Sequence, residues 1–216
     1  MDNSIGKIFK ITSFGESHGD VVGIIIDGVP AGLEFDLEFI QNEVDKRKPG
    51  QSNITTTRVE EDQVKVMSGV FKKRTTGAPL CLIIENKEID SSVYNKFKNF
   101  LRPSHIDYSA LRKYGGFSDY RGSGRFSGRI TSGFVMAGAI AKQILNKYEI
   151  KIFAYTQSIG DIIDDRVYSF DEIEKLIKLR EKSQIRALNH EKSVLMVQLI
   201  EQVIKQKDSI GGTIKC

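Results

Sequence analysis

Two histidines and a group of arginines are the candidate residues of this sequence for proton transfer and anion binding. His18 and His105 each lie in a short polar segment, at residues 16–19 and 103–107, and not on an apolar face. Imidazole gains and loses a proton near neutral pH, so two histidines beside one anionic ligand could protonate two different groups. A solitary histidine is more often structural, but the serine, glycine and arginine neighbours favour the catalytic interpretation. We therefore predict that His18 and His105 are catalytic.

The arginines are concentrated in residues 102–129, a stretch that also holds five glycines between Gly115 and Gly128. Folding needs buried apolar area to offset chain entropy, and this stretch has little aliphatic surface to bury. Guanidinium groups and closely approaching backbone N–H groups both suit phosphate or carboxylate. The stretch is therefore predicted to line an anionic site, with donors from Arg102, Arg121, Arg125 and Arg129.

An RNA-binding module is the alternative for the same stretch. Tyrosines and phenylalanines are interleaved with its basic residues, and bases stack on aromatic side chains in such modules. Composition alone leaves a small anionic molecule and a nucleic acid both open. Neither a Walker loop nor a dinucleotide-binding glycine fingerprint occurs in the sequence.

Length and composition indicate one α+β domain over residues 1–216. The hydrophobic fraction of 40% and the charged fraction of 28% are ordinary for a globular protein. A net charge of +4 permits an acidic ligand without requiring nucleic acid. No apolar run reaches signal-peptide or membrane-span length, so we expect a cytoplasmic protein. Cys81 and Cys216 offer neither a disulfide framework nor metal-ligand spacing, so we expect no protein-held metal.

Hydrophobic periodicity and turn residues predict the order of the elements. Strands are expected at residues 5–12, 21–27, 64–70, 80–85 and 151–157, with a last one beginning at 213. Helices are expected at residues 36–47, 91–100, 131–147, 170–188 and 191–207. Asp36 should cap the first of them, and Thr131 or Ser132 the third. The third helix should have Phe134 on its buried side and enough small residues to pack closely. Because the last strand pattern has only begun where the sequence stops, we expect a chain truncated at its C-terminus.

Several segments together resemble the chorismate synthase family. They are GESHG at residues 15–19, KRKPG at 46–50, DQV at 62–64, TTG at 75–77, RPSHIDY at 102–108, RGSGRFSGR at 121–129, AGAIAK at 137–142 and DSIGG at 208–212. They follow the family order from end to end of the chain. Family members are considerably longer, so the chain resembles their N-terminal portion, without the C-terminal part of the family pattern.

The resemblance implies a fold, a reaction and a set of partners. The fold would be a chorismate synthase-like β-α-β sandwich, usually assembled as a homotetramer. The reaction would be the 1,4-anti elimination of phosphate from 5-enolpyruvylshikimate 3-phosphate to give chorismate, in the shikimate pathway of aromatic amino acid biosynthesis. It would need reduced FMN, with NADPH in members that reduce their own flavin, and neither nucleic acid nor membrane. A catalytically inactive fragment is the other interpretation.

The resemblance also assigns roles to individual residues. His18 would assist the departing phosphate, and His105 would protonate or stabilise the reduced flavin. Substrate contacts are implied for Arg47, Arg102, Ser127 and Arg129, and flavin contacts for Arg125, Phe126 and Ser127, with a reduced-nicotinamide contact at Arg47. Two positions depart from the family pattern: Asn53 stands where many relatives carry an arginine, and Phe126 replaces a frequent serine.

Overall fold

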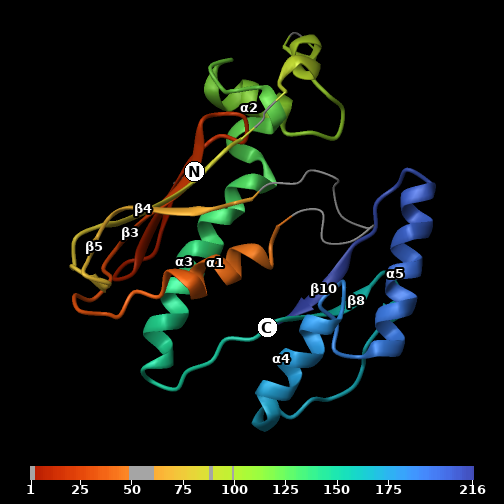
Figure 1. Cartoon of the computed structure of the whole chain (residues 1–216). Coiled ribbons are helices and arrows are strands. Elements are labelled where there is room, and N and C mark those ends of the chain that lie inside the picture. Colours follow the sequence, from red (N-terminus) through yellow and green to blue (C-terminus); the bar gives the residue numbers. More distant parts are fainter. Residues whose placement is uncertain (1–2, 49–60, 88–89, 99) are drawn as a thin grey trace. The chain divides into compact units, whose positions relative to one another are not determined.

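The structure is a computed structural model that describes residues 3–48, 61–87, 90–98 and 100–216. The described residues fall into two compact units, drawn in Figure 1. The first contains the chain up to Lys48 and from residue 61 to Glu149, and the second begins at Ile150. The predicted single domain over residues 1–216 stays a prediction. Asn53 lies outside the described residues.

The first unit is built on a five-stranded antiparallel sheet. Its order is β1 (Ser4–Ile5), β2 (Lys10–Gly15), β3 (Val21–Asp27), β7 (Leu80–Glu85) and β4 (Val64–Ser68). A separate two-stranded ribbon, β5 (Val70–Phe71) with β6 (Arg74–Thr75), lies between β4 and β7 in sequence. The prediction of one continuous strand at residues 5–12 is wrong. The chain turns at Gly6 (φ 101°), which divides it into β1 and the first part of β2.

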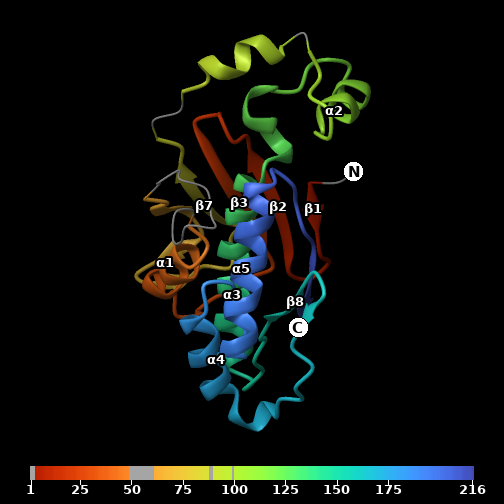
Figure 2. The ribbon, with the colours of Figure 1, turned by 90° about the vertical axis from the view of Figure 1, so that its right-hand side faces the viewer.

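Alternate residues of the central strands form the core of this unit. Val22, Ile24 and Ile26 of β3 and Leu80, Leu82 and Ile84 of β7 are all fully buried. Because side chains alternate between faces along a strand, these six share one face of the sheet. Helices α1 (Leu37–Asp45) and α3 (Thr131–Asn146) cover that face, as Figures 1 and 2 show. The backbone N–H of Phe39 donates to the Asp36 carboxylate (2.9 Å), which confirms the predicted cap of α1.

Helix α3 packs closely against β3 through small residues, as its composition predicts. A Cβ atom added at Gly133 would lie 3.0 Å from the backbone oxygen of Gly23. Phe134 is expected on the buried side, but its side chain is 45% exposed, and the buried face of the helix carries Met136 and Ile140 instead. The predicted cap by Thr131 or Ser132 is also wrong. Thr131 is the first helical residue, and Ser127 caps a preceding 3-10 turn, η3 (Gly128–Ile130), instead.

Short helices gather at one end of the sheet, at the top of Figure 2. They are η1 (Ser92–Phe97), α2 (Asp107–Tyr114) and η2 (Arg121–Phe126). The periodicity did not predict α2, which has Asp107 in its first turn and ends at Gly115 in the left-handed conformation (φ 61°). The predicted helix at residues 91–100 is a shorter 3-10 helix, η1.

The second unit has its own sheet and its own core. Strands β10 (Gly212–Lys215), β8 (Tyr155–Ile159) and β9 (Ile162–Ile163) form the sheet in that order. Helices η4 (Phe170–Glu172), α4 (Ile173–Lys182) and α5 (His190–Lys205) follow β9, and α5 is capped by Asn189. Phe153, Tyr155, Leu176 and Leu188 form the core. The strand predicted at 151–157 begins four residues late, at Tyr155.

Candidate active site

The end of the large sheet brings together segments that are far apart in sequence. Val21 pairs with Glu85 and Val64 with Ile84, so β3 and β4 begin where β7 ends. The turn at residues 16–19 joins β2 to β3 at this same end. The backbone N–H of Ser17 donates to the carbonyl of Gly124 (3.2 Å), so this turn contacts the segment at residues 121–131. The sheet register therefore places His18 beside the arginine- and glycine-rich stretch.

His18 is half-buried and held by its neighbours. Its Nδ1 atom lies 2.9 Å from the Ser91 hydroxyl oxygen, and its ring meets Tyr94 edge to face with centroids 4.9 Å apart. The Ser17 hydroxyl donates to the carbonyl of Gly122 (2.9 Å). Gly122 has φ 55°, and a Cβ atom there would lie 2.5 Å from Nε2 of His18. Only glycine therefore allows this loop to pass so close to the imidazole.

Arg129 lies at the centre of a buried polar cluster. Its side chain is 6% exposed and pairs with the Asp62 carboxylate through Nη1. Its Nε atom donates to the Asn86 side-chain oxygen at 3.0 Å. Asp62 precedes β4, and Asn86 follows β7. Two adjacent strands therefore supply the groups that orient Arg129.

Arg47 approaches the same carboxylate from the C-terminal end of α1. Its Nη1 atom lies 3.4 Å from Asp62 Oδ2. Its Nη2 donates to the carbonyl of Gly128 (3.1 Å), and its Nε donates to the Thr131 hydroxyl (3.3 Å). The structure thus brings together two predicted substrate contacts, Arg47 and Arg129, on one buried aspartate.

Arg102 forms a different ion pair. Its guanidinium group donates two hydrogen bonds of 2.8 Å to Asp107, one to each oxygen, and lies over the rings of Tyr94 and Phe97. These hydrogen bonds from Arg102 lower the pKa of Asp107 to about 2. Nη2 also donates to the Ser123 hydroxyl at 3.4 Å. Arg102 is therefore linked to the loop that packs against His18.

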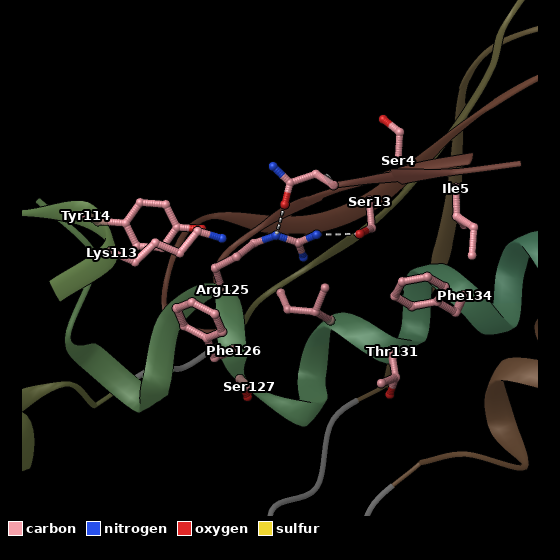
Figure 3. Close-up of a pocket in the computed structure, with 12 residues that line it drawn as sticks. Ser4, Ile5, Ser13, Lys113, Tyr114, Arg125, Phe126, Ser127, Thr131 and Phe134 are labelled. Atoms are coloured by element: carbon pink, nitrogen blue, oxygen red, sulfur yellow. Dashed lines mark hydrogen bonds between the residues drawn. The ribbon is translucent and has the colours of Figure 1, made fainter. Parts of the chain in front are cut away.

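A cavity of about 510 Å³ opens beside the segment predicted to bind flavin. Arg125 lies on its wall and donates to the side chains of Asn3 and Ser13, as the dashed lines in Figure 3 show. The Phe126 and Tyr114 rings lie 6.0 Å apart between centroids and line the same cavity. In Figure 3 the side chains of Ser127 and Thr131 point away from Arg125. These belong to the side of the segment that Arg47 contacts.

The remaining predicted residues have less defined surroundings. His105 is exposed, and it lines neither this cavity nor a second one of about 530 Å³ beside α2. Arg121 pairs with Asp119 through two hydrogen bonds of 2.8–2.9 Å. Within the described ranges, no group of three His, Cys, Asp or Glu side chains could hold a metal ion. The same ranges contain no helix long and apolar enough to cross a membrane.

Sequence reasoning did not predict the groups that hold these residues in place. They are Asp62, Asn86, Ser91, Tyr94 and Asp107, each of which contacts His18, Arg102 or Arg129. Asp62 stands in a segment that resembles the family, and that was its only signal. Asn86 and Ser91 have none. Asn86 reaches its partners through the pairing of β7 with β3, and Ser91 contacts His18 from 73 residues away.

These contacts define a cationic site, built at one end of an antiparallel sheet and suited to small anions. Comparison with known proteins identifies the family. A sequence model described as "Chorismate synthase" matches residues 9–216. The chorismate synthase of Dehalococcoides mccartyi is 49% identical over 216 residues, all of this chain. That of Methanobrevibacter smithii is 46% identical over 215 residues. The chain belongs to the chorismate synthase family.

A solved structure agrees with this assignment. "Crystal Structure of Chorismate Synthase" matches with a TM-score of 0.74 at 26% identity, over 96% of this chain and 56% of that chain. The predicted resemblance and the predicted α+β fold of chorismate synthase type are thereby confirmed. The chain spans 58% of the length of both curated relatives.

Proposed function

We propose that this chain carries the phosphate-elimination site of a chorismate synthase. The reaction is the 1,4-anti elimination of inorganic phosphate from 5-enolpyruvylshikimate 3-phosphate, which gives chorismate for aromatic amino acid biosynthesis. The observation that supports it most is the meeting of Arg47 and Arg129 on Asp62, beside the turn that carries His18. A substrate with one phosphate and two carboxylates needs several cations at one place.

In this proposal the arginines bind and orient the substrate. Arg47 donates to the segment that contains Ser127 and Arg129 and leads into α3, and Arg102 reaches the neighbouring loop through Ser123. The positive end of α3 adds to the field that an anion would meet. His18 then holds the proton that the departing phosphate accepts. The ring's contacts with Ser91 and Tyr94 keep it in one orientation.

The cavity beside Arg125 suits reduced FMN. Its volume lies in the range of small-molecule sites, which is roughly 300–1,000 Å³, and its lining combines aromatic rings with Arg125 and Lys113. When bound, reduced FMN supplies electron density while the C–O bond to phosphate breaks. Arg125, Phe126 and Ser127 would hold it. His105 does not line this cavity, so its proposed role in protonating or stabilising the flavin rests on the family resemblance. An NADPH contact at Arg47 and assembly as a homotetramer belong to the same proposal.

The experiment is an anaerobic assay of chorismate and phosphate release. The chain is mixed with reduced FMN and the enolpyruvyl substrate, both alone and fused to the remaining part of the Dehalococcoides relative. We expect the fusion to release chorismate and phosphate in equal amounts, and the His18→Ala variant of the fusion to release neither. Salt-sensitive binding of RNA without chorismate from either protein would instead support a nucleic-acid surface.

A further inference from the structure

The side-chain amide of Asn86 lies between the His18 turn and the guanidinium group of Arg129. Its Nδ2 donates to the carbonyl oxygens of Glu16 (3.1 Å) and Gly19 (2.7 Å), and its Oδ1 accepts from Arg129 Nε at 3.0 Å. Carbonyl oxygens only accept and guanidinium nitrogens only donate, so one orientation of the amide satisfies all three hydrogen bonds. Asn86 therefore ties both ends of the His18 turn to Arg129.

The sheet register explains why this amide can reach both groups. Asn86 directly follows β7, and its backbone N–H donates to the carbonyl of Asp20 at 2.9 Å, which continues the pairing of β3 with β7. The pairing of Val64 with Ile84 brings the residues that precede β4 to the end of the sheet where the chain leaves β7. Asp62 consequently approaches the same guanidinium group from the neighbouring strand.

Asp62 holds the guanidinium group of Arg129 at a second point. Its side chain is fully buried, and its carboxylate accepts from Arg129 Nη1 and lies 3.4 Å from Arg47 Nη1. Its backbone carbonyl accepts from Gln41 of α1 at 3.1 Å. A buried carboxylate is costly unless it is paired, so Asp62 and the two arginines stabilise one another. Arg129 is thus held by two residues, Asn86 after the end of β7 and Asp62 before the start of β4.

We propose that Asn86 is a positioning residue, which sets the position of His18 relative to Arg129. The inference rests on the proposed function, in which His18 protonates the phosphate that the arginines bind. A proton donor and the cation that binds the acceptor must keep a fixed spacing. A displacement of about 1 Å can cost about a hundredfold in rate.

Two substitutions separate the two links that Asn86 makes. Asn86→Asp keeps an acceptor for Arg129 and loses both donors to the His18 turn, whereas Asn86→Ala loses all three hydrogen bonds. The matched control is Gln143→Ala. The Gln143 amide bridges α3 to the backbone N–H and carbonyl of Asp36 (3.2 and 3.1 Å), near the opposite end of α3. Each alanine variant therefore loses one amide bridge, and we expect similar falls in melting temperature.

The first readout does not depend on activity. The sequence has three histidines, so their imidazole signals can be assigned by NMR. We expect the His18 signals to shift or broaden in Asn86→Asp and Asn86→Ala and to match the wild type in Gln143→Ala. The His190 signals, from the second unit, serve as an internal reference. Wild-type His18 signals in Asn86→Ala would overturn the proposal.

The second readout is kinetic. In the chorismate assay we expect Asn86→Asp to lower kcat by about tenfold to a hundredfold, because both donors to the His18 turn are lost. We also expect KM to rise, because the added carboxylate offsets positive charge at Arg129. Wild-type kcat in this variant would overturn the positioning role. If the wild-type chain and its fusion form no chorismate, the proposed function fails, and the His18 signals alone decide whether Asn86 positions the imidazole.

Discussion

The carboxylates at the candidate site neutralise only part of the positive charge of its arginines. Asp62 neutralises one of the two guanidinium charges that meet it, so the pair of Arg47 and Arg129 retains net positive charge for an anion. Arg102 has a carboxylate partner of its own in Asp107. The ion pairs therefore orient the arginines before any ligand binds, which lowers the cost of ordering them on binding.

The pair of Arg102 and Asp107 should make stability depend on pH. The hydrogen bonds from Arg102 lower the folded-state pKa of Asp107 to about 2, below its value of about 3.9 in an unfolded chain. The stabilisation is therefore complete above about pH 4 and is lost as the pH falls toward 2. We expect Asp107→Asn to lower the free energy of unfolding at neutral pH by about 1–3 kcal/mol. Denaturant unfolding from neutral pH to about pH 3 should show the difference from wild type narrowing, and a constant difference would contradict the assignment.

A second prediction at the residue scale concerns the glycine against His18. In Gly122→Ala the new Cβ atom would meet the imidazole at 2.2–2.5 Å, so we expect His18 to be displaced and chorismate formation to fall by about a hundredfold or more. Gly115→Ala is the matched control, because Gly115 has a similar φ (61°) but its nearest contact would be 3.8 Å away. Both variants should lose about 1–2 kcal/mol of stability to the left-handed conformation. Equal activity in the two variants would exclude a steric role for Gly122.

At the scale of elements, the contact of α3 with β3 decides how the site is supported. Helix α3 begins directly after the turn that contains Arg129, and its small residues let it lie close to the sheet that carries Asn86 and the His18 turn. The contact of α3 with the sheet thereby joins the segment that contains Arg129 to the strands that position His18 and Asn86. A helix with larger residues on this face would stand farther from the sheet.

Two glycines of α3 test this contact. A Cβ atom at Gly138 would meet nothing within 4 Å, whereas one at Gly133 would lie 3.0 Å from the backbone oxygen of Gly23. We expect Gly138→Ala to raise the free energy of unfolding by about 0.5–1 kcal/mol through helix propensity. Gly133→Ala should be less stable than Gly138→Ala by about 1–3 kcal/mol because of overpacking. Thermal unfolding measures both, and equal stabilities would show that the helix moves away from the sheet at little cost.

At the scale of the whole molecule, the two units have separate hydrophobic cores. All of the described site residues named above, from His18 to Arg129, belong to the first unit. Separate cores favour separate cooperative unfolding, since each core is stabilised mainly by its own contacts.

Amide hydrogen exchange can test this independence. Leu176 of α4 is 4% exposed in the second core, so Leu176→Ala should destabilise that unit by about 2–5 kcal/mol. Amides of α4 and β8 should then exchange faster, while those of β3 and β7 keep their protection. Leu179→Ala, on the same helix but 37% exposed, should change protection little. Faster exchange in both units together would instead favour the single domain expected from sequence.

Most elements whose residues alternate or recur with a clear period could be predicted from sequence. Strands β3, β4 and β7 and the capped helix α1 were all predictable, because local propensity and burial agree there. The family resemblance was also available from ordered motifs, and comparison confirmed it. Helix α2 was not predicted, because its eight residues are too few to show a clear helical period and are flanked by residues typical of loops.

The groups that hold the candidate site together come from segments that only folding brings to one place. Asp62 precedes β4 and Asn86 follows β7, so the pairing of these strands brings both to one end of the sheet. Arg129 reaches them from a segment more than 40 residues away. No local sequence pattern predicts these contacts, because hydrogen bonds between strands depend on register and not on sequence distance. The residue types indicated an anionic ligand. The fold supplied the neighbours that orient His18 and the arginines toward one end of the sheet.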